Sequence, residues 1–160
     1  MNGQVIGSRF LNCRKMLTSN DCQKRWGRPQ PIAAWESRLL VSWDVPQSIN
    51  DAILALPNRI YTNKLMVKPL EAAFRDLIQR GFSGELKTWD GSYNIRLKRE
   101  QKTLSLHCWA VAIDLNAAWN QFGAEPTLSA GFVKCFEDAG FDWGGYWAKK
   151  DGMHFQLKEI

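Results

Sequence analysis

The clearest pattern of apolar and polar positions runs from Val67 to Arg80. Its apolar residues recur every three or four positions, charged residues stand between them, and Gly81 follows directly. This spacing predicts an amphipathic helix that covers the core. Similar patterns and start signals predict shorter helical segments after Thr18 and over Ser48–Leu56, Asp114–Phe122 and Ser129–Ala139.

Alternating patterns predict the strands. Asp90-Gly91 is a strong turn signal, and the alternating runs Glu85–Trp89 and Ser92–Leu97 on either side of it predict a hairpin. Further extended segments are predicted at Leu39–Trp43, Leu104–Ile113 and Met153–Leu157. Strands mixed with helices and joined by hairpin-type connections indicate an α+β fold, in which helices pack on a mainly antiparallel sheet.

Length and composition agree with one small globular domain. The chain has 160 residues, of which 45% are hydrophobic and 23% charged, and no apolar run is long enough to cross a bilayer. We therefore expect residues 1–160 to form a single domain, monomeric and without membrane insertion, with residues 1–17 as an N-terminal arm. The start of the chain lacks a signal-peptide pattern, so we expect synthesis in the cytoplasm.

A net charge of +5 favours an anionic partner, which can be nucleic acid, a membrane surface or an acidic cell-wall polymer. The densest basic run, Arg96–Lys102, is interrupted by Glu100 and by apolar positions. This interruption indicates a solvated loop rather than a surface that follows nucleic-acid phosphates.

The cysteines show no metal-binding spacing, and we expect reduced, buried thiols. They are Cys13, Cys22, Cys108 and Cys135. Cys108 stands beside His107 and so suggests a Cys–His nucleophile. Adjacent residues of an extended segment point to opposite faces, which argues against direct pairing of these two side chains.

The two histidines of the chain each stand near an aspartate. His107 precedes Asp114 by seven positions, and His154 follows Asp151 by three. Two imidazoles and one carboxylate can fill three positions of a tetrahedral zinc site, with the fourth open to water and one aspartate left to act as a base. The alternative is that each histidine is a hydrogen-bonded core residue and each aspartate a turn former. Spacing alone leaves both open.

A zinc site here requires a particular geometry. On a regular strand the odd spacing would place His107 and Asp114 on opposite faces, so Asp114 must lie at a strand end or beyond a bulge. Asp151 should lie in the turn Lys149–Gly152, and His154 on the strand that follows it. The two pairs then converge only if their strands are neighbours in the sheet.

These residues carry a family resemblance. The positions that match the pattern S-x-H-x-x-(G/A)-x-A-x-D followed by D-x-x-H-F are Ser105, His107, Ala110, Ala112, Asp114, Asp151, His154 and Phe155. The double motif resembles that of zinc peptidases of bacterial cell-wall metabolism, namely VanY-type D-alanyl-D-alanine carboxypeptidases and phage L-alanyl-D-glutamate endolysins. The stretch Phe141–Trp147 is similar to the loop before the second motif in the endolysin branch.

Two positions depart from the family pattern. Ala110 stands where the family usually has glycine, which is tolerable unless the residue needs a positive φ. Gln156 stands where an acid often follows His-Phe. Neither change removes a ligand.

The resemblance implies a site and roles for its residues. His107, Asp114 and His154 would bind Zn²⁺. Asp151 would be the general base, and Arg96 would hold the oxyanion or a peptide carboxylate. Substrate contacts are expected from Ser105, Trp143 and Trp147.

The implied function is a zinc-dependent peptidase that cleaves the stem peptide of peptidoglycan. The Trp-Gly-Gly loop, the missing signal peptide and the small single domain favour a phage endolysin with L-alanyl-D-glutamate endopeptidase activity. Such an enzyme would be made in the bacterial cytoplasm and would act on the wall in the periplasm during host lysis. Two alternatives stay open, a D-alanyl-D-alanine carboxypeptidase and a non-catalytic module that binds cell wall or nucleic acid.

Overall fold

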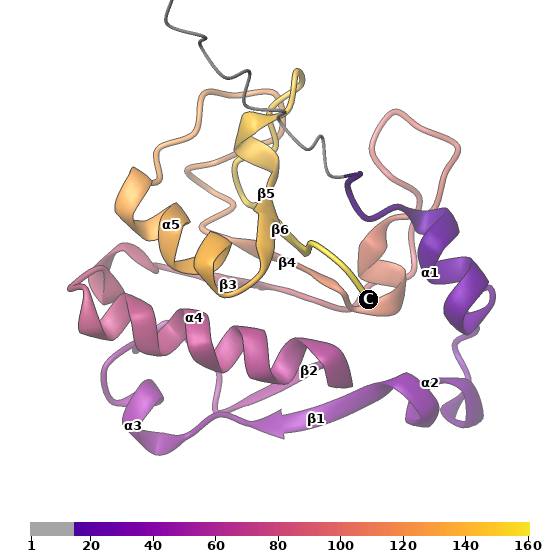
Figure 1. Cartoon of the computed structure of the whole chain (residues 1–160), viewed down its shortest axis with the longest axis horizontal. Helices are drawn as coiled ribbons and strands as arrows, with labels where there is room; N and C mark the ends of the chain where they lie inside the picture. Colours follow the sequence, from indigo (N-terminus) through magenta and orange to yellow (C-terminus); the bar gives the residue numbers. More distant parts are fainter. Residues whose placement is uncertain (1–14) are drawn as a thin grey trace, which may run out of the picture.

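The computed structural model describes residues 15–160 and shows an α+β fold with two antiparallel sheets (Figure 1). The smaller sheet pairs β1 (Leu40–Asp44) with β2 (Arg59–Asn63). The larger sheet has the strand order β3 (Trp89–Gly91), β4 (Ala112–Leu115), β6 (His154–Leu157) and β5 (Phe141–Trp143). Most of the expected N-terminal arm, with Cys13, lies outside the described residues.

Five α-helices and four short 3-10 helices complete the described part of the chain. The α-helices are α1 (Ser19–Trp26), α2 (Ala33–Leu39), α3 (Gln47–Asn50), α4 (Val67–Gln79) and α5 (Ala130–Asp138). The 3-10 helices are η1 (Lys64–Met66), η2 (Ser83–Glu85), η3 (Leu106–Trp109) and η4 (Gly144–Tyr146). No helix among residues 15–160 has the length and apolar character needed to span a membrane.

Helix α4 lies beside the smaller sheet and α5 (Figure 1), with one face buried and the face of Lys68, Ala72, Arg75 and Gln79 exposed. The fully buried Phe74 ring stacks on Trp43 of β1 at 6.4 Å and meets Phe136 of α5 edge-on at 6.3 Å. Helix α5 covers one face of the larger sheet, where Phe136 lies 4.6 Å from Phe155 of β6. Because side chains alternate along β6, His154 and Gln156 face away from this core.

The helices predicted from periodicity are confirmed where the pattern was long or capped. The bounds of α4 and α5 agree with Val67–Arg80 and Ser129–Ala139 to within a residue at each end. Helix α1 begins after Thr18, whose hydroxyl accepts from the Asp21 N–H while the Asp21 carboxylate accepts from the Thr18 N–H. Helix α3 (Gln47–Asn50) is a single turn that overlaps only the start of the predicted segment Ser48–Leu56. Helix α2 was not predicted, because seven residues between proline-containing segments show too little of a period.

Three local predictions are wrong, and each fails because a tertiary contact replaces the local pattern. The hairpin about Asp90 does not form, since β3 pairs with β4 instead of with Ser92–Leu97. Leu104–Ile113 is not one strand, because Leu106–Trp109 forms a 3-10 helix. Asp114–Phe122 is not a helix, because Asp114 lies within β4.

Long-range contacts explain the last of these errors and a fourth, the loop expected at Phe141–Trp147. Asn116 adopts a positive φ of 52°, and its side-chain oxygen accepts from the backbone N–H groups of Lys87 and Thr88, which ends β4 with a turn. The predicted aromatic loop Phe141–Trp147 likewise forms a strand, β5, and the 3-10 helix η4, because β5 pairs with the edge of β6. Neither contact has a signal in the local sequence.

Candidate metal centre

His107 reaches the site from a 3-10 helix rather than from a strand. Ser105 caps η3 through its hydroxyl, which accepts from the His107 N–H at 3.3 Å. Ala110 ends the helix with a φ of 50°, the left-handed conformation that favours glycine. Thr62 Oγ1 and the Asn63 N–H both donate to the Ala110 carbonyl, so strand β2 holds this conformation in place. The turn brings the His107 ring over β4.

Asp114 and His154 lie directly opposite each other on the neighbouring strands β4 and β6. Leu115 N donates to Met153 O and Leu157 N donates to Val111 O. This alternation makes Asp114–His154 a non-hydrogen-bonded pair, the type whose side chains approach most closely. The geometry expected for zinc is therefore present, with Asp114 near a strand end and the strands side by side.

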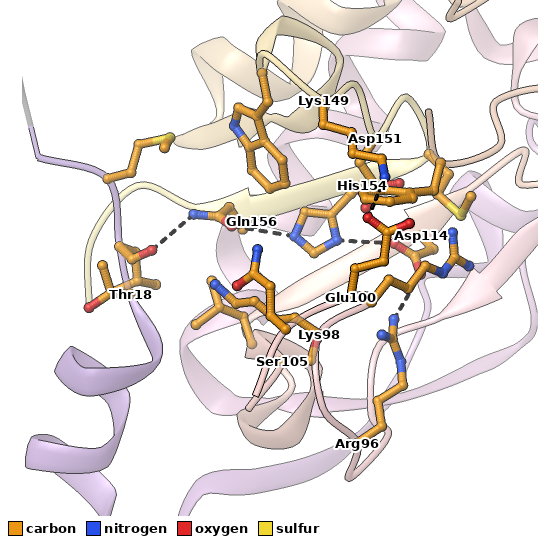
Figure 2. Close-up of a pocket in the computed structure, with 18 of the residues that line it drawn as sticks. Thr18, Arg96, Lys98, Glu100, Ser105, Asp114, Lys149, Asp151, His154 and Gln156 are labelled. Carbon is orange, nitrogen blue, oxygen red and sulfur yellow. Dashed lines mark hydrogen bonds and ion pairs between the residues drawn. The ribbon is translucent and has the colours of Figure 1, made fainter. Parts of the chain in front are cut away.

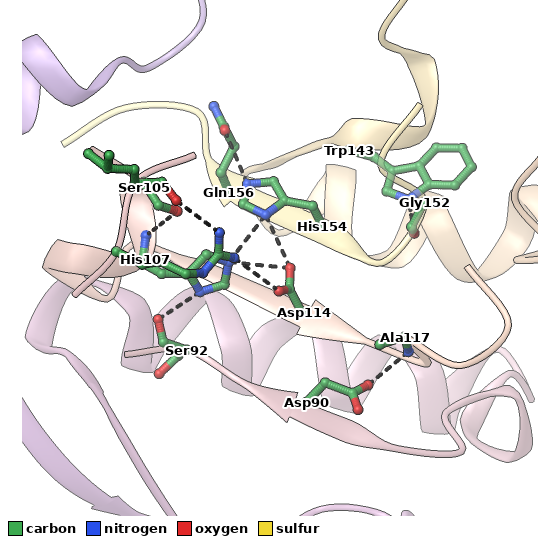
Figure 3. Close-up of polar contacts among 12 residues, drawn as sticks. Asp90, Ser92, Ser105, His107, Asp114, Ala117, Trp143, Gly152, His154 and Gln156 are labelled. Atoms are coloured by element: carbon green, nitrogen blue, oxygen red, sulfur yellow. Dashed lines mark hydrogen bonds and ion pairs between the residues drawn. The ribbon is translucent and has the colours of Figure 1, made fainter. Parts of the chain in front are cut away.

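Three potential ligand atoms converge at this point (Figure 3). His107 Nε2 lies 3.3 Å from Asp114 Oδ1 and 3.3 Å from His154 Nδ1, and His154 Nδ1 lies 3.2 Å from Asp114 Oδ1. A tetrahedral zinc site with bonds of about 2.0–2.1 Å has ligand–ligand edges of about 3.3–3.4 Å. The three separations fit one face of such a tetrahedron.

The remaining ring nitrogens show which tautomers are present. His107 Nδ1 lies 2.9 Å from the Ser92 carbonyl oxygen, which can only accept, so Nδ1 carries the proton. His154 Nε2 lies 3.3 Å from Gln156 Oε1, and Gln156 Nε2 donates to the Leu17 carbonyl. Each outer ring nitrogen thus has an acceptor, so the nitrogen that faces Asp114 is the one available to a metal, as in histidine ligands of metals.

Asp114 is a carboxylate in a mostly buried position. Burial alone would raise its pKa, but hydrogen bonds to His107 and His154 more than offset burial, and the pKa lies well below its ordinary value. Arg96 adds a positive charge, with Nη2 3.8 Å from Asp114 Oδ2. An ionised oxygen and two ring nitrogens thus face one another, and a metal cation that took the place of the ring protons would be held by all three.

Asp151 stands beside the three ligands in the turn before β6, where its carbonyl accepts from the His154 N–H. Its Oδ1 is buried and has no hydrogen-bond partner within residues 15–160. Burial is the main cause that raises the pKa of this carboxyl, and the charge of Asp114 adds to it. A half-buried carboxylate with one unpaired oxygen that binds protons more readily than usual is suited to act as a base.

These groups open into a cavity of about 500 Å³ (Figure 2). Its lining includes Arg96, Ser105, Asp114, Trp147, Asp151 and His154. The Trp147 ring lies 5.4 Å from the His154 ring and so forms part of the wall. Trp143 does not line the cavity, since its indole stacks on Phe155 and is directed away from the ligands (Figure 3).

The basic run lies on the cavity wall rather than in a free loop. Leu97 pairs with Leu104, and this short hairpin brings Lys98 and Arg99 to the cavity. Across the mouth, Lys149 forms an ion pair with Glu100. The spacing of residues within Arg96–Lys102 did not predict that this run lines the cavity.

Two groups that contact the outer ring nitrogens of the histidines, Gln156 and the Ser92 carbonyl, were not predicted as site residues. Gln156 shares a face of β6 with His154, so the i, i+2 rule for strands was a usable signal. A backbone carbonyl such as that of Ser92 has no sequence signal.

The Cys108 thiol donates to the Arg96 carbonyl at 3.1 Å, and burial raises the pKa of the thiol. Its contacts are with the Arg96 backbone, which also donates to Cys108 Sγ.

The site combines three candidate metal ligands with a neighbouring carboxylate, the set of groups found in hydrolases that use one metal ion. Residues 99–157 match the family model described as D-alanyl-D-alanine carboxypeptidase. The matched range contains all three candidate ligands and Asp151, so the likeness to this family of metallopeptidases falls on the part of the chain that holds the candidate metal site. Searches of curated proteins and of solved structures give no match.

Proposed function

We propose that the protein is a zinc peptidase that cleaves the stem peptide of peptidoglycan, with the L-alanyl-D-glutamate endopeptidase activity of phage endolysins. The supporting observation is the convergence of His107 Nε2, His154 Nδ1 and Asp114 Oδ1 at 3.2–3.3 Å, with the outer ring nitrogens held by the Ser92 carbonyl and by Gln156. The family match to wall-directed peptidases supports the same substrate class. We place its action on the cell wall, in the periplasm.

The residues around the ligands can perform the proton transfers of peptide hydrolysis. Zinc, when bound, supplies an acidified water with a pKa of about 7 and a Lewis acid for the scissile carbonyl. The Asp151 carboxylate accepts a proton from the attacking water and delivers it to the leaving amine. Its unpaired Oδ1 and its raised pKa suit both transfers.

Arg96 is the group best placed to bind negative charge beside the metal. Its guanidinium lies 3.8 Å from Asp114 and lines the cavity, so it can hold the developing oxyanion or a substrate carboxylate. Lys98 and Arg99 add positive charge to the same wall. A stem peptide carries several carboxylates and complements this wall.

The cationic wall also suits the free terminal carboxylate of a carboxypeptidase substrate, which keeps D-alanyl-D-alanine carboxypeptidase as the second candidate. The non-catalytic alternative does not explain why the buried Oδ1 of Asp151 has no hydrogen-bond partner, since such an oxygen costs stability. Binding of DNA with a steep salt dependence by a zinc-free protein would favour that alternative.

Mass spectrometry of purified peptidoglycan after digestion separates these activities. New N-terminal D-glutamate is expected for the endopeptidase, whereas release of free D-alanine would establish the carboxypeptidase instead. Unchanged muropeptides with a zinc-loaded protein would reject both.

The role of Asp151 is tested by Asp151→Asn, which should keep about one zinc per chain and lose most hydrolysis. The matched control is Asp142→Asn, a change of the same kind on β5 and outside the cavity lining. Near-normal turnover of Asp151→Asn would show that another group is the base.

A further inference from the structure

The backbone around Asp151 is held by the loop that follows β5. Gly144 O accepts from the Asp151 N–H at 3.0 Å and from the Trp147 N–H at 3.1 Å. On the other side of Asp151, the indole Nε1–H of Trp143 donates to Gly152 O at 2.8 Å. With the bond from His154 N to Asp151 O, three hydrogen bonds fix the peptide units on both sides of this carboxylate.

The two glycines of the Trp-Gly-Gly sequence make this approach possible. A Cβ on Gly144 would lie 2.6 Å from the Asp151 carbonyl oxygen and 3.1 Å from Asp151 Cβ, so the two segments are in direct backbone contact. A Cβ on Gly145 would lie 2.3 Å from the Trp143 ring. Gly145 therefore leaves the space that lets the indole fold beneath the loop and reach Gly152.

The indole has no direct access to a substrate. Trp143 is buried, stacks on Phe155 at 6.2 Å and lies outside the cavity lining. Its single polar atom is engaged with the residue next to Asp151 (Figure 3). A tryptophan chosen for packing alone does not need this donor, because phenylalanine fills a core equally well.

We propose that Trp143 and Gly144 are positioning residues, which hold the Asp151 carboxylate in its catalytic orientation without touching the substrate. This inference rests on the proposed role of Asp151 as the general base. The Trp143–Gly152 bond fixes the position of the turn, and the Gly144–Asp151 bond fixes its distance from β5. Small displacements of a catalytic group lower the rate steeply.

The first test is Trp143→Phe, which keeps an aromatic ring against Phe155 but removes the N–H donor together with part of the ring volume. We expect kcat to fall about tenfold, with KM and zinc content unchanged. The matched control is Trp35→Phe on α2, which removes a comparable bond from Trp35 Nε1 to Trp26 O at 3.1 Å, outside the cavity. An equal fall of kcat in both variants, or no fall in Trp143→Phe, would overturn the proposal.

A double-mutant cycle separates positioning from general damage. If Trp143 acts through Asp151, Trp143→Phe has no further effect on the residual activity of Asp151→Asn. An unchanged tenfold effect in that background would contradict positioning. If Asp151→Asn by itself keeps full activity, the assignment of the base has failed, which is a separate result.

Gly144→Ala provides a second variant that leaves the indole intact. Its methyl group would press on the Asp151 carbonyl, and we expect a fall in kcat of tenfold or more. Gly84→Ala is the control, since a Cβ there meets nothing within 4 Å and its φ is not positive. Full activity of Gly144→Ala would show that the contact does not position Asp151.

A measurement without activity completes the test. The Asp151 amide donates to Gly144 O, so its hydrogen exchange in zinc-loaded protein reports whether the turn is held. Exchange should be at least tenfold faster in Trp143→Phe than in Trp35→Phe. Equal protection of this amide in the two variants would count against the proposal.

Discussion

Gln156 links the metal site to the start of the described chain, and its replacement offers a quantitative test of the site. Its Oε1 lies 3.3 Å from His154 Nε2, and its Nε2 donates to Leu17 O at 3.2 Å. Gln156→Leu keeps nearly the same shape and removes both contacts. The ring Nε2–H of His154 and the backbone carbonyl of Leu17 are then buried without partners.

The size of the effect follows from these two groups. Each unsatisfied buried group costs about 1–3 kcal/mol, so unfolding should become easier by about 2–6 kcal/mol, or about 4–24 °C in the melting temperature at about 2–4 °C per kcal/mol. Loss of the partner that orients a metal-binding histidine weakens metal binding by about 10–100-fold. Both numbers are measurable.

Zinc affinity is measured by competition with a chromophoric chelator, and stability by urea unfolding of the metal-free protein. Gln156→Glu is the comparison, since its carboxylate still accepts from His154 but no longer donates to Leu17. We expect Gln156→Glu to keep zinc affinity and to lose stability. If Gln156→Leu binds zinc within twofold of the unaltered protein, the assignment of His154 Nδ1 as a ligand is wrong.

Three further outcomes are expected. Free zinc at about 1,000 times its Kd should stabilise the fold by about 4 kcal/mol, so calorimetry with a chelator should show melting about 8–16 °C lower, and equal melting would contradict a metal site. Ala110→Val should lower the free energy of unfolding, measured in urea, by more than about 2 kcal/mol, because a β-branched residue is strained at φ 50°. Ala110→Gly should change that free energy by less than about 1 kcal/mol, since relief of strain offsets the lost methyl group. Because the folded-state pKa of Asp151 is raised, this carboxyl favours the folded state below its ordinary pKa and loses that contribution as pH rises through the raised value. The metal-free Asp151→Asn protein should therefore gain stability over the unaltered protein between pH 4 and pH 7 in urea unfolding, and a constant difference would refute the raised pKa.

The amino-acid sequence by itself determined the long amphipathic helices and the set of reactive side chains. Helix α4 has several turns of uninterrupted period, and α1 has a capping box, so each is specified within a few residues of chain. The pairing of His107 and His154 with Asp114 and Asp151 was visible because the chain has only two histidines and each stands within a few residues of an aspartate.

Only the tertiary structure decided how those side chains are presented. His107 depends on a 3-10 turn whose left-handed residue, Ala110, is held by hydrogen bonds from Thr62 and Asn63, more than forty positions earlier. The tautomers depend on the Ser92 carbonyl and on Gln156, and the Gln156 amide in turn depends on Leu17. Trp143, expected on the cleft wall, lies in the core because the following glycines let its ring fold beneath the loop.

The physical reason is the range of the interactions involved. Periodicity and caps act over one or two turns of chain, so they can be read from neighbouring residues. Strand register, a positive φ outside glycine and the partner of a buried nitrogen are set by segments far away in sequence. The candidate metal ligands can therefore be recognised from the local sequence. Their approach depends on the register of β4 against β6, which places Asp114 opposite His154.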